Sequence, residues 1–150
     1  AGDADHVSGL LNEAGSMALW RIAIKPGRPL ALGMWNGTPV FGLPGNPVST
    51  TLCLYRYVMP ALWQMLGADH WPRRRFGILQ KEILFKKDLT YFLPVKVQTN
   101  YAGHVLATPV AMNGSGDFAS LALSDGFLEL PAQKNHFMKD EVFPLWSWKP

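Results

Sequence analysis

Residues 42–49 read Gly-Leu-Pro-Gly-Asn-Pro-Val-Ser, and this stretch predicts a loop that leads directly into a long helix. The helix is expected from about Pro47 to Leu66, because Asn46 is a good N-cap and proline suits the first helical position. Pro60 lies inside this span and is expected to kink or divide the helix, since proline has no N–H for an interior turn. Apolar residues recur at steps of four and three, so one face is predicted to be buried. These residues are Val48, Leu52, Tyr55, Met59, Leu62 and Leu66.

The first predicted helix is preceded by two carboxylates. Its apolar stripe runs from Val7 to Ala14 with i, i+3, i+4 and i+7 spacing, and Gly15 ends it. Asp3 and Asp5 come just before it, and carboxylate oxygens are ligands that Mg²⁺ prefers. The local sequence favours a simpler alternative, in which Asp5 is only the N-cap of the helix. Both roles stay open for Asp5 at this point.

A strand is predicted over Met17–Lys25, and it places two cations on one face. Side chains alternate along a strand, so Arg21 and Lys25 point to the same side, and both are expected to face the Gly42–Pro47 loop. Arg28 follows in the turn. Clustered cations suit an anionic ligand such as a phosphate or another oxyanion. The alternative is an exposed strand face with ordinary surface charges, which the residues alone favour.

The loop before the long helix follows a predicted hairpin and is a second candidate for anion binding. Asn36-Gly37 is a hairpin dipeptide, and it joins short strands predicted at 30–34 and 38–42. Backbone N–H groups and the helix dipole favour an anion at a helix N-terminus, and Gly45 would let a ligand approach the backbone closely. Ser49 has two candidate partners, a bound anion and the helix backbone. The alternative is a purely structural turn between a strand and a helix.

The residues after Gly67 predict a different kind of domain. Two-residue periodicity replaces helical periodicity, and turn residues such as Asn113-Gly114 separate the segments. Short strands are predicted at 76–85, 91–99, 104–112, 126–130 and 141–148. We therefore predict α/β plus all-β architecture: the last part of an α/β domain over residues 1–70, and a small β-barrel over residues 71–150.

Composition and charge exclude several classes of protein. Hydrophobic residues make up 48 % of the 150 residues and charged ones 17 %, which is a globular balance. No apolar run is long enough to span a bilayer and no signal pattern is present, so a cytoplasmic protein is expected. Cys53 is the single cysteine and the histidines are scattered, so no zinc site is predicted. The net charge is only +3 with one dense basic run, Arg73-Arg74-Arg75, so nucleic-acid binding is not expected.

Four motifs occur along the chain in a fixed order. They are Gly2-Asp3-Ala4-Asp5, residues 20–29 (Trp-Arg-Ile-Ala-Ile-Lys-Pro-Gly-Arg-Pro), residues 42–49, and residues 114–131, which begin Gly-Ser-Gly-Asp-Phe-Ala-Ser-Leu and end Leu-Pro. In order and spacing they resemble the MoeA/gephyrin family of molybdopterin molybdenumtransferases, over nearly the whole chain. The resemblance is to the C-terminal part of that family. It implies the end of a MogA-like α/β domain followed by the family's β-barrel domain IV.

The resemblance implies an activity and roles for particular residues. Family members take adenylated molybdopterin and molybdate, cleave the adenylate with the help of Mg²⁺, release AMP and leave molybdenum on the dithiolene. Asp5 matches the family's acidic active-site residue, and Arg21 and Lys25 match two basic positions of its substrate pocket. Ser49 and Ser115 match residues near the proposed molybdate site. The other implied residues are Pro26, Gly27, Arg28, Gly45, Asn46 and Pro47 for substrate binding, and Asp3 beside Asp5 for metal binding.

The chain also departs from the family pattern. The family's last domain has an anion-contacting arginine where this chain has Phe92-Leu93-Pro94, so molybdate is expected to bind less tightly. The front of the MogA-like domain and two N-terminal domains have no counterpart, so we expect this chain to be inactive alone. The resemblance implies a homodimer for the full-length protein, with molybdopterin nucleotide and molybdate as ligands and no membrane partner. The alternative is a non-catalytic molybdopterin-binding or protein-interaction module.

Overall fold

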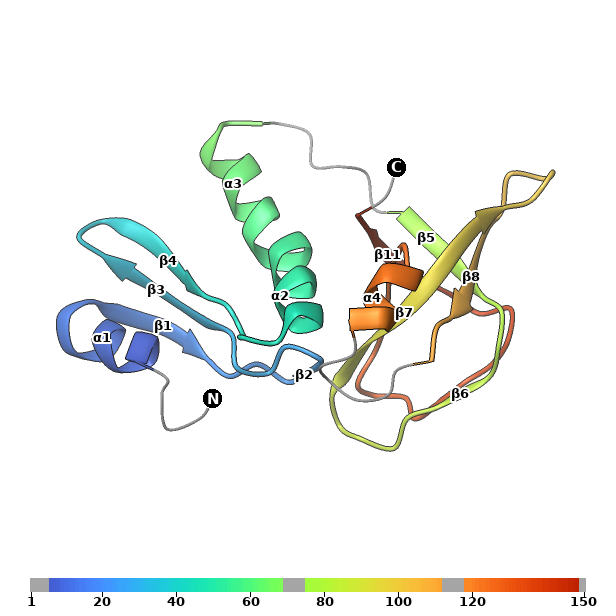
Figure 1. Cartoon of the computed structure of the whole chain (residues 1–150), viewed down its shortest axis with the longest axis horizontal. Helices are drawn as coiled ribbons and strands as arrows, with labels where there is room; N and C mark the ends of the chain where they lie inside the picture. The colour runs from blue at the N-terminus through green and yellow to red at the C-terminus, as the bar shows by residue number, and fades with distance from the viewer. Residues whose placement is uncertain (1–5, 69–74, 112–117, 149–150) are drawn as a thin grey trace.

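The computed structural model describes residues 6–68, 75–111 and 118–148, and it consists of two units that lie side by side (Figure 1). The first is a mixed α/β unit and the second is a small closed β-barrel, which confirms the predicted fold class. The predicted boundary between residues 70 and 71 lies outside the described residues. None of the described helices is long and apolar enough to cross a membrane.

The first unit contains a three-stranded antiparallel sheet with β3 in the middle. Its strands are β1 (Ser16–Trp20), β3 (Ala31–Trp35) and β4 (Thr38–Gly42). Asn36 and Gly37 have φ angles of 46° and 75°, the left-handed conformation that a two-residue hairpin turn requires. The predicted hairpin is therefore confirmed. Helix α1 (His6–Ala14) packs on this sheet and buries Leu11.

The prediction of one strand over Met17–Lys25 is wrong, because the chain turns in its middle. β1 ends just before Arg21, whose φ of 60° lies outside the extended region. The backbone N–H of Arg21 donates to Leu30 O at 3.1 Å, which closes a loop. The short strand β2 (Ile24–Lys25) leaves the first sheet and pairs in parallel with β7 (Thr90–Thr99) of the barrel. Side-chain alternation therefore does not continue across the predicted strand.

The long helix is present and is divided as predicted. Its segments are α2 (Pro47–Cys53), the π-helical turn η1 (Leu54–Val58) and α3 (Met59–Met65). The N–H of Met59 donates to Leu54 O, an i→i−5 bond, immediately before Pro60. Proline has no N–H and its ring crowds the carbonyl four residues earlier, so a widened turn at this place relieves the conflict.

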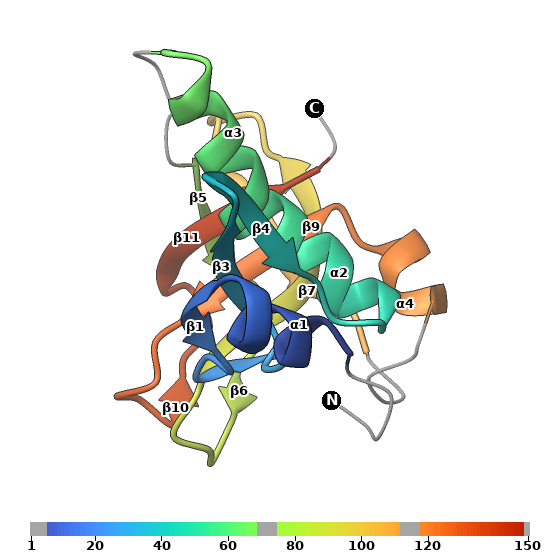
Figure 2. The ribbon, with the colours of Figure 1, turned by 90° about the vertical axis from the view of Figure 1, so that its left-hand side faces the viewer.

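The buried face of the long helix is shorter than the periodicity predicts. Val48 and Leu52 are 1 % and 0 % exposed, whereas Leu62 and Leu66 are 43 % and 78 % exposed. In Figure 2 α3 extends upward beyond the strands of the first sheet. Periodicity identifies which face of a helix is apolar, but it does not tell how far the neighbouring layer reaches along that face.

The second unit is a barrel closed by five strands in the order β7-β8-β5-β11-β9, with β9 pairing back to β7. The strands are β5 (Arg75–Leu79), β7 (Thr90–Thr99), β8 (Val105–Pro109), β9 (Gly126–Leu130) and β11 (Val142–Ser147). The predicted strand 76–85 divides into β5 and β6 (Ile83–Leu84), and β6 pairs with β10 (His136–Phe137). Helix α4 (Phe118–Leu123) has no counterpart among the predicted elements. The barrel is filled by a cluster of buried apolar residues that includes Leu79, Leu93, Val95, Leu128 and Leu145.

A second apolar cluster joins the two units. It consists of five buried residues, Ile24 of β2, Val48 and Leu52 of α2, Phe92 of β7 and Phe127 of β9. Fully burying a side chain of this size contributes about 1.5–3 kcal/mol. Because the members come from both units, the barrel is packed against the long helix and is not attached by the intervening segment alone. The turn that follows β2 is therefore held at the junction of the two units.

Candidate functional site

Three of the predicted site residues, Asp3, Asp5 and Ser115, lie outside the described residues. The others lie on two segments, the loop that begins at Arg21 and ends in the turn at residues 25–28, and the loop at residues 42–49. In the part of the chain that the structure describes, no three His, Cys, Asp or Glu side chains come together in a way that could hold a metal ion.

The turn at residues 25–28 is packed closely on the long helix. Gly27 has a φ of 103°, a conformation that favours glycine. A Cβ at this position would lie 3.0 Å from Ile24 Cδ1 and 3.1 Å from Cys53 Sγ, so the backbone itself touches the helix. The peptide bond before Pro26 is cis, and Pro26 is buried. Burial raises the pKa of the Cys53 thiol to about 12, so this thiol stays protonated and serves as a packing contact.

Lys25 contacts the barrel. Its Nζ lies 5.7 Å from the centroid of the Phe85 ring, within the range of a cation–π contact. Phe85 in turn stacks on Tyr91, with ring centroids 4.3 Å apart and an interplanar angle of 13°. Tyr91 is also the register partner of Lys25 in the β2–β7 pair. Burial raises the pKa of the Tyr91 phenol, so its hydroxyl stays protonated and able to donate at neutral pH.

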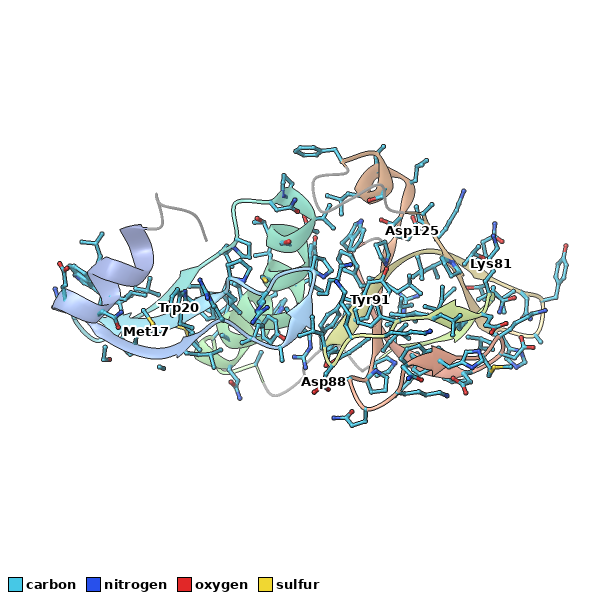
Figure 3. The ribbon with its side chains drawn as sticks, turned by 90° about the horizontal axis from the view of Figure 1, so that it is seen from below. Met17, Trp20, Lys81, Asp88, Tyr91 and Asp125 are labelled. Carbon is cyan, nitrogen blue, oxygen red and sulfur yellow. The ribbon has the colours of Figure 1, made fainter. Side chains whose placement is uncertain are left out.

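Arg21 contacts a different neighbour. Its Cζ lies 4.3 Å from the centroid of the Trp20 ring, and both side chains are exposed. In Figure 3 Trp20 lies within the first unit, whereas Tyr91 lies at the junction with the barrel. The prediction that Arg21 and Lys25 share one strand face is therefore wrong, because the strand breaks at Arg21. Because alternation does not continue past Arg21, it gives no reason for both side chains to face the Gly42–Pro47 loop.

The Gly42–Pro47 loop ends in a well-formed helix cap, as predicted. The side chain of Asn46 accepts a hydrogen bond from Ser49 N at 3.2 Å, and Pro47 is the first helical residue. Ser49 is 4 % exposed and its hydroxyl donates to Asn46 Oδ1 at 3.4 Å. That hydroxyl therefore belongs to the cap, as in the structural alternative. Gly45 is exposed, and a Cβ on it would meet no atom within 4 Å, so the space beside it is open.

The position of Pro94 does not favour an arginine there. Pro94 is fully buried in β7, opposite Phe127 of β9. A long charged side chain at this place would have to be accommodated in the packed wall of the barrel. The geometry therefore does not support an anion-contacting arginine at this position of the chain.

A polar pocket of about 350 Å³ adjoins Phe85, and no motif in the sequence indicated it. Its lining consists of Lys86, Lys87, Asp88, Ala132, Gln133, Lys134 and Asn135. The loop before β7 and the loop after β9 form it, and Phe85 N donates to Asn135 O at 2.9 Å between them. Lys134 is ion-paired with Glu141, so the pocket's excess positive charge comes from Lys86 and Lys87 beside Asp88. The Lys86-Lys87 pair is the one local signal, and such pairs are common on solvated loops.

Two family models match the chain, and each covers one unit. A model described as a probable molybdopterin binding domain matches residues 1–64. A model of the MoeA C-terminal region (domain IV) matches residues 77–148. The division between them falls where the structure passes from the α/β unit to the barrel.

Individual relatives agree with both models. A molybdopterin molybdenumtransferase of Synechocystis is 41 % identical over 129 residues, covering 85 % of this chain and 30 % of the relative. Gephyrin of Dictyostelium discoideum is 35 % identical, covering 94 % of this chain and 23 % of the relative. The crystal structure of a molybdopterin biosynthesis MoeA protein from Pyrococcus horikoshii superposes with a TM-score of 0.80 at 30 % identity, covering 98 % of this chain and 36 % of that one. This chain thus spans about a third or less of each relative. It belongs to the MoeA/gephyrin family and corresponds to the C-terminal portion of that family.

Proposed function

We propose that this chain is part of a molybdopterin molybdenumtransferase, which inserts molybdate into adenylated molybdopterin and releases AMP. A relative that carries this name aligns with 85 % of the chain at 41 % identity. The observation that supports the proposal best is the position of Lys25. This cation lies on a turn that is fixed by α2 behind it and by the barrel in front of it.

Such a fixed cation suits both anionic substrates. Molybdate is an oxyanion, and the adenylated pterin carries phosphate groups. The Lys25 ammonium is only partly exposed, so an anion beside it is screened less than on the open surface. Arg28, which is exposed at the end of the same turn, supplies a second cation. Lys86 and Lys87 of the pocket beside Phe85 add positive charge on the barrel side, whereas Lys134 there is paired with Glu141.

The reaction itself needs charge stabilisation. Release of AMP requires attack at phosphorus, and groups that are already in place stabilise the negative charge that develops there. We assign this role to Lys25 and to Arg21, whose guanidinium is exposed on Trp20. We assign substrate contacts to Pro26, Gly27, Gly45, Asn46, Pro47 and Ser115. Ser49 contributes by holding the Asn46 cap, since its own hydroxyl is buried there.

Mg²⁺ forms part of the proposal through Asp3 and Asp5. Two carboxylates in a short Gly-Asp-Ala-Asp segment offer the oxygen ligands that this ion prefers, and they leave positions for water and phosphate oxygens. When bound, the ion would neutralise phosphate charge. Asp5 has a second role open to it as the helix N-cap, and the two roles are separable by substitution.

The complete activity requires more than this chain. Because the chain covers 30 % of the Synechocystis relative, we propose that full turnover needs regions of such relatives that this chain does not span. We also propose that the full-length protein is a homodimer. The chain would then contribute one part of a composite site for molybdate and the pterin nucleotide.

The test is molybdate-dependent release of AMP. Purified full-length protein is incubated with adenylated molybdopterin and Mg²⁺, with molybdate or without it, and AMP is quantified by chromatography. We expect AMP release to depend on molybdate and to follow a saturation curve. Binding of the adenylated pterin without AMP release would identify the chain as part of a non-catalytic molybdopterin-binding module instead.

A further inference from the structure

Arg56 of the π-helical turn η1 forms an ion pair with the barrel. Its Nη2 donates to Glu129 Oε1 at 3.4 Å, and its Nε lies 3.4 Å from Glu129 Oε2. Glu129 belongs to β9, so the pair crosses from one unit to the other. The two side chains are only 27 % and 23 % exposed, and solvent screens such a pair less than a pair on the open surface.

Aromatic rings surround this ion pair. Arg56 Cζ lies 4.5 Å from the centroid of the Trp146 ring and 5.0 Å from that of the Tyr57 ring. Trp146 Nε1 donates to Glu129 Oε2 at 2.7 Å, so both oxygens of the carboxylate are in contact with donors. The planar guanidinium of arginine is suited to this place because it stacks on rings while its edge faces a carboxylate. We refer to Arg56, Tyr57, Glu129 and Trp146 as the Arg56 cluster.

Stability alone does not account for an arginine here. Arg56 Nε is buried and makes no hydrogen bond, so its approach to Glu129 is only electrostatic. A buried donor without a hydrogen bond is unfavourable, and an apolar side chain of the same length avoids that penalty. An ion pair adds positional specificity, because the pair is favourable only when the Glu129 carboxylate lies beside the Arg56 guanidinium.

The Arg56 cluster and the Lys25 turn attach the barrel at different heights along the same helix. Gly27 is packed against Cys53, and Arg56 follows Cys53 by about one helical turn. In Figure 1 β2 lies at the foot of the helix, and the segment between α2 and α3 lies above it. Tyr57 and Trp146 pack against the apolar cluster that joins the units. Two attachments at different heights along the helix fix the angle between the barrel and the helix, whereas a single attachment would let the barrel pivot.

We propose that Arg56 is a positioning residue for the Lys25 site. By holding Glu129 and Trp146, it fixes the angle of the barrel against the long helix, and this angle places Phe85 and Tyr91 beside Lys25. The inference rests on the proposed function for the identity of the anion, whereas the positional role can be measured without any ligand.

Hydrogen exchange in the complete 150-residue chain tests the positional role. Thr90 N donates to Ala23 O at 3.0 Å across the junction, whereas Gln80 N donates to Ala107 O at 3.0 Å within the barrel. In Arg56→Met we expect the Thr90 amide to exchange at least about tenfold faster and the Gln80 amide to change by less than about twofold. Arg75→Met, which removes an exposed arginine of β5, is the charge-matched control and should change neither. An unchanged Thr90 amide, or equal acceleration at Thr90 and Gln80, would overturn the inference.

A second variant tests whether Arg56 acts through Glu129. Glu129→Gln keeps an oxygen for Trp146 Nε1 and the shape of the side chain, but it removes the charge that Arg56 faces. We expect this variant to accelerate Thr90 exchange about as much as Arg56→Met, and the double variant to add little more, because both changes break the same pair. If the two substitutions accelerated Thr90 exchange by factors that multiply in the double variant, Arg56 would not act through Glu129.

Molybdate titration connects the cluster with the site. If the wild-type full-length protein binds molybdate, Arg56→Met should raise the dissociation constant several-fold although Arg56 is not part of the Lys25 turn. An unchanged dissociation constant together with faster Thr90 exchange would show that Arg56 positions the barrel but not the site, and would overturn the inference. Absence of binding to the wild type would instead contradict the proposed function, and the exchange result would still decide whether Arg56 fixes the barrel.

Discussion

The ammonium nitrogen of Lys25 lies 5.7 Å from the centre of the Phe85 ring, so a cation of the first unit rests on an aromatic side chain of the barrel. Phe85 is placed by the loop between β6 and β7 and by its stacking on Tyr91. The contact forms because β2 leaves the first sheet and pairs with β7. The candidate anion site is therefore built by the junction of two units, and changes on either side of the junction should affect it.

Gly27→Ala is expected to destabilise the chain, because both its backbone angle and its surroundings require glycine. The φ of 103° is unfavourable for alanine, and the new Cβ would lie 3.0 Å from Ile24 Cδ1 and 3.1 Å from Cys53 Sγ. We expect a loss of about 1–3 kcal/mol in the free energy of unfolding, measured by urea denaturation. Gly45→Ala is the matched control and should be near neutral, since nothing lies within 4 Å of its Cβ. Equal stability of the two variants would disprove the close packing of the turn.

Alkaline pH is expected to destabilise the fold, in part through Cys53. Burial raises the pKa of its thiol from 9.0 to about 12, so the unfolded chain loses this proton first. The thiol's contribution to stability is thus fully present below about pH 9 and is lost as the pH rises toward 12. Burial also raises the pKa values of the Tyr57 and Tyr91 phenols, so these groups add to the loss of stability at alkaline pH.

The share of Cys53 in this loss can be isolated. Urea unfolding of the wild type and of Cys53→Ala is compared at about pH 8 and at about pH 10.5, where the unfolded thiol is ionised and the folded one is not. We expect the wild type to lose more stability between the two pH values than the variant does. Parallel losses would mean that the thiol is not buried against Gly27 as described.

Pro94→Arg is expected to unfold or strongly weaken the barrel, and not to tighten molybdate binding. The side chain is fully buried opposite Phe127, so the substitution would place a long charged side chain in the packed barrel wall. A loss of about 3–5 kcal/mol in the free energy of unfolding is expected. Pro94→Val is the control, because an apolar β-branched residue suits a buried strand position. A stable Pro94→Arg protein that binds molybdate more tightly would contradict this placement and would support an anion-contacting arginine at this position.

Asp5 is expected to be required for turnover in the full-length protein but not for folding. Asp5→Ala removes a carboxylate, and even the loss of a helix N-cap costs only about 0.5–2 kcal/mol, which a domain usually survives. Asp5→Asn removes only the charge, because asparagine is as good an N-cap residue as aspartate. We expect both variants to lose Mg²⁺-dependent AMP release in steady-state assays while circular dichroism stays unchanged. Near-normal turnover of Asp5→Asn at saturating Mg²⁺ would return Asp5 to the role of a helix cap.

Features that depend on neighbouring residues could be predicted from the sequence. Asn46 and Pro47 define the start of the long helix because capping and proline geometry act within one turn. Asn36-Gly37 defines the hairpin because both residues accept positive φ angles. The motifs around Lys25 and Asn46 likewise led to the family, since each motif is continuous in sequence.

Features that depend on distant residues could not be predicted. The break at Arg21 is stabilised by a hydrogen bond to Leu30 and by the pairing of β2 with a strand more than sixty residues away, so no local period reveals it. The same holds for Phe85, which reaches Lys25 only because the barrel docks on α2. The C-terminal part of α3 is exposed because the first sheet does not reach that far along the helix, and an apolar stripe in the sequence does not show where the sheet ends.

The most direct test of the account is calorimetric titration of the full-length protein with molybdate, comparing the wild type with Lys25→Ala. Lys139→Ala, which removes an exposed lysine on the turn before β11, controls for the loss of one positive charge. A fixed cation in contact with an anion is worth about 1.5–3 kcal/mol, so Lys25→Ala should raise the dissociation constant at least about tenfold while the control stays within about twofold. If Lys25→Ala binds molybdate as tightly as the wild type, or no more weakly than the control, the turn at the junction is not the anion site.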